Sequence, residues 1–205
     1  MTNDIKQGTP EWKALRLGKI TASRVSDVIA QIKSGEAASK TEYRIELVCE
    51  RLTGKETDGY TNAHMERGIE LEPFARAAYE VRQGVFVEQV AFVDHPTVSN
   101  AGASPDGLVG DDGCIEIKCP MVKTHIKTIL DKKAPSKYLP QMQWQIACTG
   151  RKWVDFVSYC PDLPENMQIF IARVDRDDEY IGMLEDAVRV FDSEIETMIE
   201  RLKGM

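Results

Sequence analysis

The stretch GASPDGLVGDDGCIEIKCP, residues 102–120, decides the fold. Two short apolar runs lie on either side of the sequence DDG, and Gly, Pro and Asp bound both runs, which is the pattern of a β-hairpin. We expect Asp111-Asp112-Gly113 to form a three-residue loop with the glycine in the left-handed conformation. This loop would pair Gly110 with Cys114 across the hairpin.

Charged residues occupy positions in this hairpin where a sheet core favours apolar ones. Because side chains alternate across a strand, Glu116 and Lys118 share one face. The neighbouring Ile115 and Ile117 point to the other face, toward the core. In the predicted register Asp106 lies opposite Lys118 and is a diagonal neighbour of Glu116, about 7–8 Å away. The hairpin is therefore expected to bring two carboxylates and one lysine together.

A pair of half-buried carboxylates favours a bound cation. Without a counter-charge the two groups repel each other and lose hydration, and Mg²⁺ or Mn²⁺ is the oxygen-ligated ion that such a site selects. The alternative is a hydrated face on which Lys118 pairs with Asp106, an arrangement worth about 0.2–1 kcal/mol. The pattern alone leaves both open, although Pro105 and Pro120, which fix the backbone before and after it, favour the first.

Hydrophobic periodicity predicts the elements outside the hairpin. Thr9 and Pro10 form a helix start, and Gly18 ends that helix. Further helices are expected from residue 21 or 23 and at residues 41–52, 63–82, 124–130, 138–149 and 176–203, and strands within 85–95 and at 153–159 and 167–174. We expect the 63–82 helix, which Pro73 should kink, to bury a set of apolar side chains. They are Met65, Ile69, Phe74, Ala78 and Val81.

The order of these elements indicates the fold class. Helices come first, a cluster of strands follows, and the two kinds then alternate, which predicts an α/β fold with a central mixed β-sheet flanked by helices. The chain has 205 residues, of which 42% are hydrophobic, and this suits one domain spanning residues 1–205.

Composition excludes several classes of protein. The five cysteines form no CxxC pair, so a disulfide framework and a zinc site are not expected. No run approaches the ~20 apolar residues of a membrane span, and the N-terminus lacks a signal peptide's apolar core, so we expect a cytoplasmic protein without a membrane partner. The net charge of −7 argues against a generally basic nucleic-acid binder. However, residues 123–137 hold five lysines and one aspartate, whereas the last thirty residues are acidic.

The hairpin residues resemble the PD-(D/E)xK nucleases, since Pro105-Asp106 supplies the PD and Glu116-Ile117-Lys118 the ExK. The chain resembles the lambda-type phage alkaline exonucleases of viral recombination systems more closely. The matching segments, in the family's order, are GTPEWKALRLGKITASRVSDVIA (residues 8–30), RGIELEPFARAAYE (67–80), SPDG (104–107), EIKCP (116–120) and YLPQMQW (138–144). Each is weak alone, but the ordered set is specific and covers most of the chain.

This resemblance implies a fold and an activity. The fold is a single exonuclease domain with a restriction-endonuclease-like core. The activity is Mg²⁺-dependent digestion of one strand of linear double-stranded DNA from a 5′-phosphate end, which releases mononucleotides and leaves a 3′ single-stranded tail. The family also implies a ring-shaped homotrimer, a single-strand annealing protein as partner, and a phage or prophage origin in a bacterial cell.

The resemblance assigns roles at the cutting centre by matching positions. Asp106, Glu116, Glu72 and the main-chain carbonyl of Ile117 correspond to ligands of two Mg²⁺ ions, for which Mn²⁺ substitutes. Lys118 corresponds to the lysine that orients or activates the attacking water. The helix glutamine that supports the site corresponds to Gln143, with Gln141 and Gln145 as alternatives if the register shifts.

The resemblance also assigns residues that bind DNA. Arg16, Ser23 and Ser104 correspond to the 5′-phosphate pocket, and Thr124 stands where the family has a second arginine. Lys33 corresponds to a basic loop residue ahead of the cut, and Lys123 and Lys127 of the lysine run would follow the DNA backbone. Phosphate contacts carry no sequence information, so little sequence specificity is expected.

Two alternatives stay open at this stage. Other PD-(D/E)xK nucleases, such as endonucleases, junction resolvases and single-strand nucleases, use the same chemistry on other substrates. An inactive DNA-end-binding protein is the second alternative, although the three acids and the lysine are all present. The clustered cysteine trio of iron–sulfur relatives is absent from the sequence.

Overall fold

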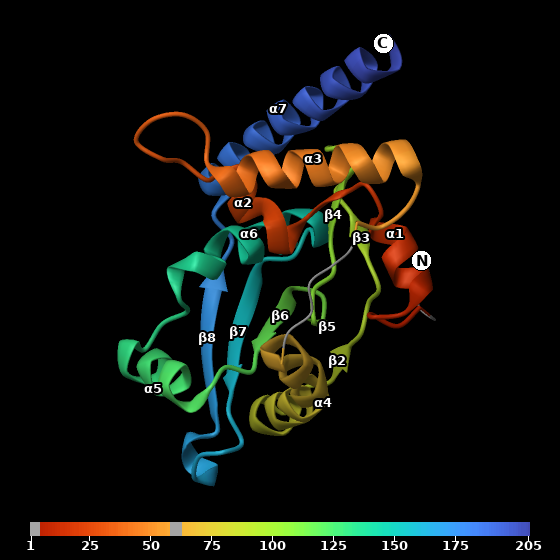
Figure 1. Cartoon of the computed structure of the whole chain (residues 1–205). Helices are drawn as coiled ribbons and strands as arrows, with labels where there is room; N and C mark the ends of the chain where they lie inside the picture. Colours follow the sequence, from red (N-terminus) through yellow and green to blue (C-terminus); the bar gives the residue numbers. More distant parts are fainter. Residues whose placement is uncertain (1–4, 58–62) are drawn as a thin grey trace.

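The computed structural model describes residues 5–57 and 63–205. Its helices are α1 (Pro10–Arg16), α2 (Val25–Val28), α3 (Ala38–Thr53), α4 (Ala63–Gln83), α5 (Val122–Asp131), α6 (Leu139–Thr149) and α7 (Asp178–Lys203). Its strands are β1 (Ile20–Thr21), β2 (Val87–Glu88), β3 (Val93–Asp94), β4 (Ala101–Ala103), β5 (Gly107–Val109), β6 (Gly113–Lys118), β7 (Trp153–Tyr159) and β8 (Ile169–Asp175). Short 3₁₀ turns occur at Ala22–Arg24, Ser136–Tyr138 and Glu165–Met167. In Figure 1, α3 and α7 lie above the long strands β7 and β8.

The described strands form two mixed sheets. The larger has the order β2-β5-β6-β7-β8, and the smaller has the order β1-β4-β3. Strand β6 runs parallel to β7 and antiparallel to β5, and β7 runs antiparallel to β8. The predicted α/β fold with a central mixed sheet flanked by helices is confirmed.

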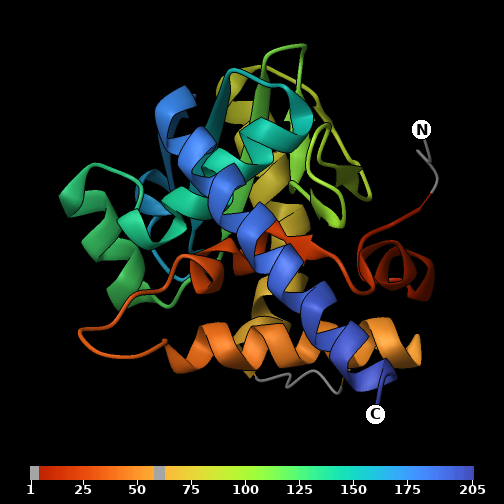
Figure 2. The same cartoon turned by 90° about the horizontal axis from the view of Figure 1, so that it is seen from above.

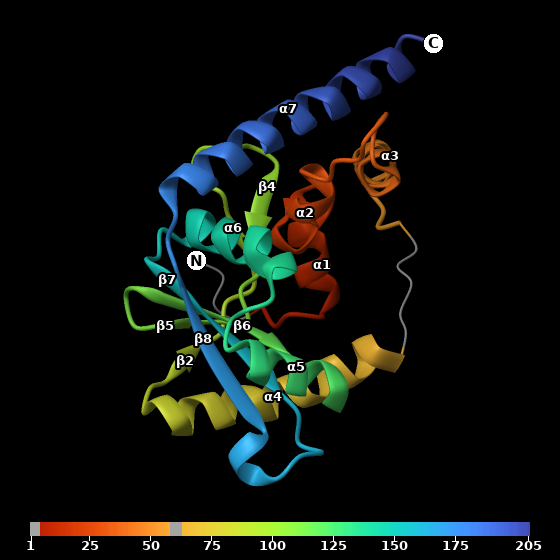
Figure 3. The same cartoon turned by 90° about the vertical axis from the view of Figure 1, so that its left-hand side faces the viewer.

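Helices cover both faces of β6. On one face, Ile115 and Ile117 pack in a cluster with Tyr79 of α4. On the other face, Cys114 packs in a separate cluster with Met142 of α6. Figure 3 shows α4 and α6 on opposite sides of the larger sheet. Glu116, near the middle of β6, is therefore enclosed.

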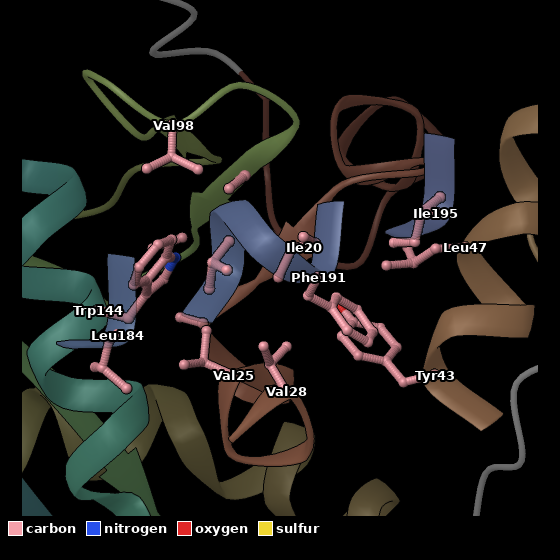
Figure 4. Close-up of a cluster of buried hydrophobic side chains, with 14 of the residues drawn as sticks. Ile20, Val25, Val28, Tyr43, Leu47, Val98, Trp144, Leu184, Phe191 and Ile195 are labelled. Carbon is pink, nitrogen blue, oxygen red and sulfur yellow. The ribbon is translucent and has the colours of Figure 1, made fainter. Parts of the chain in front are cut away.

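The largest apolar cluster joins the N-terminal elements to α6 and α7 (Figure 4). Phe191 of α7 stacks on Tyr43 of α3 with ring centroids 5.7 Å apart. Ile20 of β1, Val25 of α2 and Trp144 of α6 are fully buried in the same cluster. Figure 2 shows α7 crossing the molecule toward α3. This cluster fixes the N-terminal elements against the rest of the fold.

The hairpin register differs from the prediction by two residues. Val109 pairs with Gly113 and Gly107 with Ile115, so the loop consists of residues 110–112 and its left-handed glycine is Gly110, with φ +52°. Gly113 lies in the strand, and a β-carbon at this position would be 2.1 Å from the Trp153 ring. Close packing of this ring, and not the turn, explains that glycine. Since the error is an even number of residues, the predicted faces of the strand are correct.

The predicted buried face of α4 is wrong. Ile69, Phe74 and Val81 are 69%, 64% and 86% exposed, whereas Ala75 and Tyr79 are buried. The hydroxyl of Tyr79 donates a hydrogen bond of 2.8 Å to the carboxylate of buried Asp155. This helix packs through a small residue and an amphipathic one, which a search for large apolar side chains does not detect. The side chain of Met65 lies outside the described part, and Pro73 lies within α4 as expected.

Other predicted elements are confirmed. Thr9 caps α1 by accepting a hydrogen bond from the Trp12 amide at 3.3 Å, and Gly18 adopts φ +70° after the helix. The expected helices at 124–130, 138–149 and 176–203 correspond to α5, α6 and α7, and the expected strands at 153–159 and 167–174 to β7 and β8. In the described part of the chain, no helix is long and apolar enough to cross a membrane.

Candidate active site

The hairpin places its acidic residues against α6. Asp106 lies one residue before the start of β5, and its amide donates a hydrogen bond of 3.2 Å to the carbonyl of Ile115. Since Gly107 pairs with Ile115, the same register continued by one residue places Asp106 opposite Glu116 and not opposite Lys118. The Oδ2 atom of Asp106 accepts a hydrogen bond of 2.6 Å from the amide of Ile117. The Asp106 carboxylate is thus held at the residue that follows Glu116 on β6.

Glu116 is almost fully buried, with 1% of its surface exposed, and three donors satisfy it. Lys118 forms an ion pair with Oε1, to which Gln141 of α6 also donates at 2.7 Å. Gln145, one turn further along α6, donates to Oε2 at 2.5 Å. Because these three contacts come from β6 and α6, the two elements fix the orientation of the carboxylate.

The predicted role of Gln143 is wrong, and the alternatives Gln141 and Gln145 take its place. The amide of Gln143 donates to the Asp175 carbonyl at 2.7 Å and accepts from the Asp177 amide at 3.0 Å, so it ties α6 to the start of α7. Residues four apart share a face of a helix, whereas residue 143 is turned about 200° from residue 141. A glutamine pair at this spacing, facing an acidic strand, is the signal that would have found the contact.

Glu72 is linked to the hairpin by an arginine that the sequence analysis did not single out. Arg76, one turn after Glu72 on α4, forms an ion pair with Glu72 Oε1. Its Nε–H also donates 3.2 Å to the main-chain carbonyl of Asp106. The site therefore contains three carboxylates and the two cations Arg76 and Lys118.

These charges shift two pKa values upward. Asp106 keeps some accessible surface, yet loss of hydration is the largest cause that raises its pKa well above the usual value, followed by the charge of Glu116 and then that of Glu72. Lys118 and the Ile117 amide oppose this shift. Burial lowers the pKa of Lys118, but Glu116 and Asp106 outweigh it and the net pKa is raised. Lys118 is therefore a charged ammonium at neutral and mildly alkaline pH.

The predicted metal ligands fit a hard divalent cation by their chemistry. Asp106, Glu116, Glu72 and the Ile117 carbonyl offer only oxygen atoms, the donors that Mg²⁺ prefers. Loss of hydration, together with the charges of Glu116 and Glu72, disfavours the ionised form of Asp106 in the absence of a cation. As the side chains stand, no three acidic, histidine or cysteine groups within residues 5–57 and 63–205 already form a metal cluster. Lys118 pairs with Glu116 and Arg76 with Glu72, so two of these carboxylates already have a cationic partner.

Two of the predicted phosphate-binding residues share a cavity of about 440 Å³ between α1 and α3. Arg16 and Ser23 both line it. The Arg16 guanidinium stacks on the Trp12 ring, 4.0 Å from its centroid, and makes no ion pair within the described residues. Burial lowers its pKa, but charges of nearby acids oppose the shift. Arg16 is therefore a charged group available for an anion.

Ser104 connects this cavity to the acidic cluster. The Trp12 indole N–H lies 2.9 Å from Ser104 Oγ, and Ser104 precedes Pro105-Asp106 in the chain. Its hydroxyl donates 2.6 Å to the carbonyl of Ala91. The Trp12–Ser104 contact is thus the link between the Arg16 cavity and the hairpin.

Thr124 and the predicted DNA-track lysines lie on the surface. Thr124, Lys123 and Lys127 are exposed on α5, and Lys33 is exposed in the loop before α3. Thr124 is not among the described residues that line the Arg16 cavity. The adjacent His125 is buried and bonded to Ser158 Oγ at 2.7 Å, so it has a structural role.

Comparison with known proteins gives the family. The YqaJ-like viral recombinase domain matches residues 11–152, which is more than half of the chain. The chain belongs to this family. The resemblance to the lambda-type alkaline exonucleases is thereby confirmed.

Solved structures of exonucleases are similar to this family member over most of their length. The alkaline exonuclease LHK-Exo from Laribacter hongkongensis is 53% identical, with a TM-score of 0.89 over 95% of this chain and 96% of that chain. Its complex with dAMP matches equally well. A phage-related exonuclease from Haemophilus somnus 129PT is 16% identical, with a TM-score of 0.75 over 90% of this chain and 96% of that chain, and supports the fold. No curated protein matches the chain. These similarities identify a nuclease of the exonuclease type.

Replacing Asp106 by Asn tests the electrostatic description of the site. Because folding raises the pKa of Asp106, its carboxyl group contributes to stability at pH values below the ordinary pKa of 3.8. This contribution is lost as the pH rises through the raised pKa. At pH 8, without divalent ions, Asp106→Asn should therefore raise the free energy of unfolding, and by more than at pH 4. Urea titrations at pH 4 and pH 8 measure this.

The matched control for this prediction is Asp111→Asn in the exposed hairpin loop, which should leave stability unchanged at both pH values. A variant at position 106 that is equally or less stable than the wild type at pH 8 would contradict the charge imbalance.

Proposed function

We propose that the chain is a Mg²⁺-dependent 5′-to-3′ exonuclease that digests one strand of linear double-stranded DNA to mononucleotides. It leaves a 3′ single-stranded tail that serves single-strand annealing recombination. The observation that carries this proposal is the group of Asp106, Glu116 and Lys118, which the Trp12–Ser104 contact links to an arginine cavity suited to a terminal phosphate.

Oxygen ligands for two cations come from Asp106, Glu116, Glu72 and the carbonyl of Ile117. Bound Mg²⁺ supplies Lewis acidity and lowers the pKa of water, and Mn²⁺ substitutes for it. Gln141 and Gln145 keep the Glu116 carboxylate in one orientation, and hydrogen bonding of this kind to a ligand preserves its geometry.

Lys118 contributes positive charge beside the phosphodiester. Its raised pKa keeps the ammonium protonated when it is paired with Glu116. The Tyr138 ring, 5.2 Å from the ammonium nitrogen, restricts where the side chain can move. From this position it would orient the attacking water and stabilise the negative charge that develops on phosphate oxygens.

The Arg16 cavity would recognise the 5′ end. A guanidinium fork suits bidentate contact with phosphate, and Ser23 and Ser104 would add hydroxyl donors. Since the Trp12–Ser104 contact connects the cavity to Asp106, a phosphate held there would set the distance to the first scissile bond. Binding of dAMP by the relative LHK-Exo supports a site that accepts one nucleotide.

Exposed cations would guide the duplex, and the family suggests how the enzyme works in the cell. Lys33, Lys123 and Lys127 offer phosphate contacts without sequence preference. A ring-shaped homotrimer around the DNA and a single-strand annealing protein as partner are part of the proposal and rest on the family resemblance alone.

Substrate choice distinguishes this function from the related nucleases. With Mg²⁺, linear duplex DNA bearing a 5′-phosphate should be degraded to mononucleotides and should leave the 3′-ended strand intact, as seen with each strand end-labelled in turn. Closed circular and single-stranded DNA are the controls and should persist. Cutting of closed circles, or activity in EDTA, would contradict the proposal.

Lys118→Ala should bind DNA as the wild type does but cut it at least about 100-fold more slowly, the size of effect expected on loss of one charge-stabilising donor. Gel-shift and single-turnover assays separate the two steps. Lys152→Ala is the control, because this lysine is 72% exposed and pairs with a loop aspartate. An active Lys118→Ala variant would remove the lysine from the mechanism.

Arg16→Ala should remove the preference for 5′-phosphate over 5′-hydroxyl ends. A hydrogen bond between charged groups contributes about 1.5–3 kcal/mol, so the initial rate on phosphorylated ends should fall about 10- to 100-fold. The rate on 5′-hydroxyl ends should change little. Arg201→Ala on the exposed end of α7 should retain the preference. Equal preference in wild type and Arg16→Ala would show that the phosphate binds elsewhere.

A further inference from the structure

Arg76 contacts two separate parts of the acidic site. Its Nη2 donates to Glu72 on the same helix, and its Nε donates 3.2 Å to the Asp106 carbonyl on the hairpin. Since α4 lies on the opposite face of β6 from α6, these contacts join the acid of α4 to the hairpin that carries the other two acids. None of the matches to known nucleases assigns a role to this residue.

Burial distinguishes this arginine from an ordinary helix-surface cation. The side chain of Arg76 is only 12% exposed, whereas that of Glu72 is 33% exposed. A solvated pair at this spacing contributes little, but a guanidinium that is mostly removed from water needs all of its donors satisfied. Arg76 is therefore held in one place by its partners.

A third segment completes the environment of the guanidinium. With the Gln89 amide oriented so that its oxygen faces Arg76, that oxygen accepts from Nη1 at 2.8 Å and from Nη2 at 3.1 Å. Gln89 follows β2, the edge strand beside β5. The fork geometry of one side chain thus connects α4, the β2 connection and the Asp106 backbone.

The negative charge of Glu72 changes the pKa of neighbouring groups. Its charge is among the causes that raise the pKa of Asp106, and it also raises that of Cys119 at the end of β6. The charge of Glu72 therefore reaches the hairpin acids, yet nothing in the hairpin donates to it directly among the described residues. The contact that fixes its carboxylate is the one with Arg76.

We propose that Arg76 is a positioning residue for the reaction: its guanidinium holds the Glu72 carboxylate at a fixed distance from the Asp106 backbone, so that three acids form one cation site. This inference rests on the proposed metal-dependent function. Arginine suits the task because its planar fork reaches several acceptors at once, whereas a lysine at the same place keeps the charge but offers a single nitrogen.

Arg76→Lys separates position from charge. Because the net charge stays the same, a change in cation affinity reports on geometry. Isothermal titration calorimetry with Mn²⁺ should show affinity weakened about 10-fold, and kcat should fall about 10-fold while KM for DNA stays within about twofold, as expected when a group that orients a ligand is altered. Arg82→Lys, an exposed arginine on the same helix, is the matched control and should match the wild type.

A double-mutant cycle tests whether the effect passes through Glu72. In the Glu72→Gln background, Arg76→Lys should have little further effect on Mn²⁺ affinity, since the carboxylate that it positions is gone. Full additivity of the two substitutions would overturn the proposal. So would an Arg76→Lys variant with wild-type Mn²⁺ affinity, whatever its activity.

A measurement on the wild-type protein tests the proposal even if the Arg76→Lys variant does not fold. The ¹⁵N–¹H signal of Arg76 Nε–H should be visible and slow to exchange with solvent, with and without Mg²⁺, because it is bonded to a carbonyl. Rapid exchange of this proton would contradict the hydrogen bond between Arg76 and the Asp106 carbonyl. Wild-type protein that binds no Mn²⁺ would contradict the proposed function itself, whereas an unaffected Arg76→Lys variant contradicts only the role of Arg76.

Discussion

The enclosure of Glu116 in the central strand is the constraint on which the rest of the site depends. Strand β6 is paired on both edges and covered on both faces, so the carboxylate at its middle has almost no contact with solvent. A buried charge in this position is tolerated only with partners. The lysine two residues later on the same strand and two glutamines of α6 are those partners.

The same constraint explains why several elements converge on the hairpin. Asp106 lies opposite Glu116, and the two negative charges raise the demand for cations in a region that water cannot screen. Lys118 and Arg76 meet part of that demand from opposite sides of the sheet. In the proposed function a divalent ion would meet the rest of that demand and would supply the Lewis acid for phosphodiester chemistry. The cost in stability and the capacity for catalysis have one electrostatic origin.

Particular residues show how far sequence reasoning extended. The shared face of Glu116 and Lys118 was predictable because strand alternation is local, and it survived a register error of two residues. The predicted register was wrong because Gly113 was taken for a turn residue, whereas it makes room for the Trp153 ring. The two residues are 40 positions apart, so a turn pattern does not reveal their contact. Gln143 was assigned by alignment of a motif, whereas helix rotation turns its neighbours at 141 and 145 toward Glu116. The sequence did not indicate the contacts of Arg76. One partner is the backbone carbonyl of Asp106, and both the hairpin and Gln89 come close to Arg76 only on folding.

The sequence by itself determined the family and the fold class, and it singled out the acids and the lysine of the candidate site. These depend on local order: strand alternation, turn residues and the succession of motifs along the chain. Only the tertiary structure decided which face of α4 is buried and which glutamines hold Glu116. It also showed that Arg16 and Ser23 line one cavity, and that Thr124 is not among the described residues that line it. The physical reason is that hydrogen bonds and packing between distant segments are set by how helices rotate and dock on the sheet. Hydrophobic periodicity does not encode that rotation when a helix packs through alanine and tyrosine.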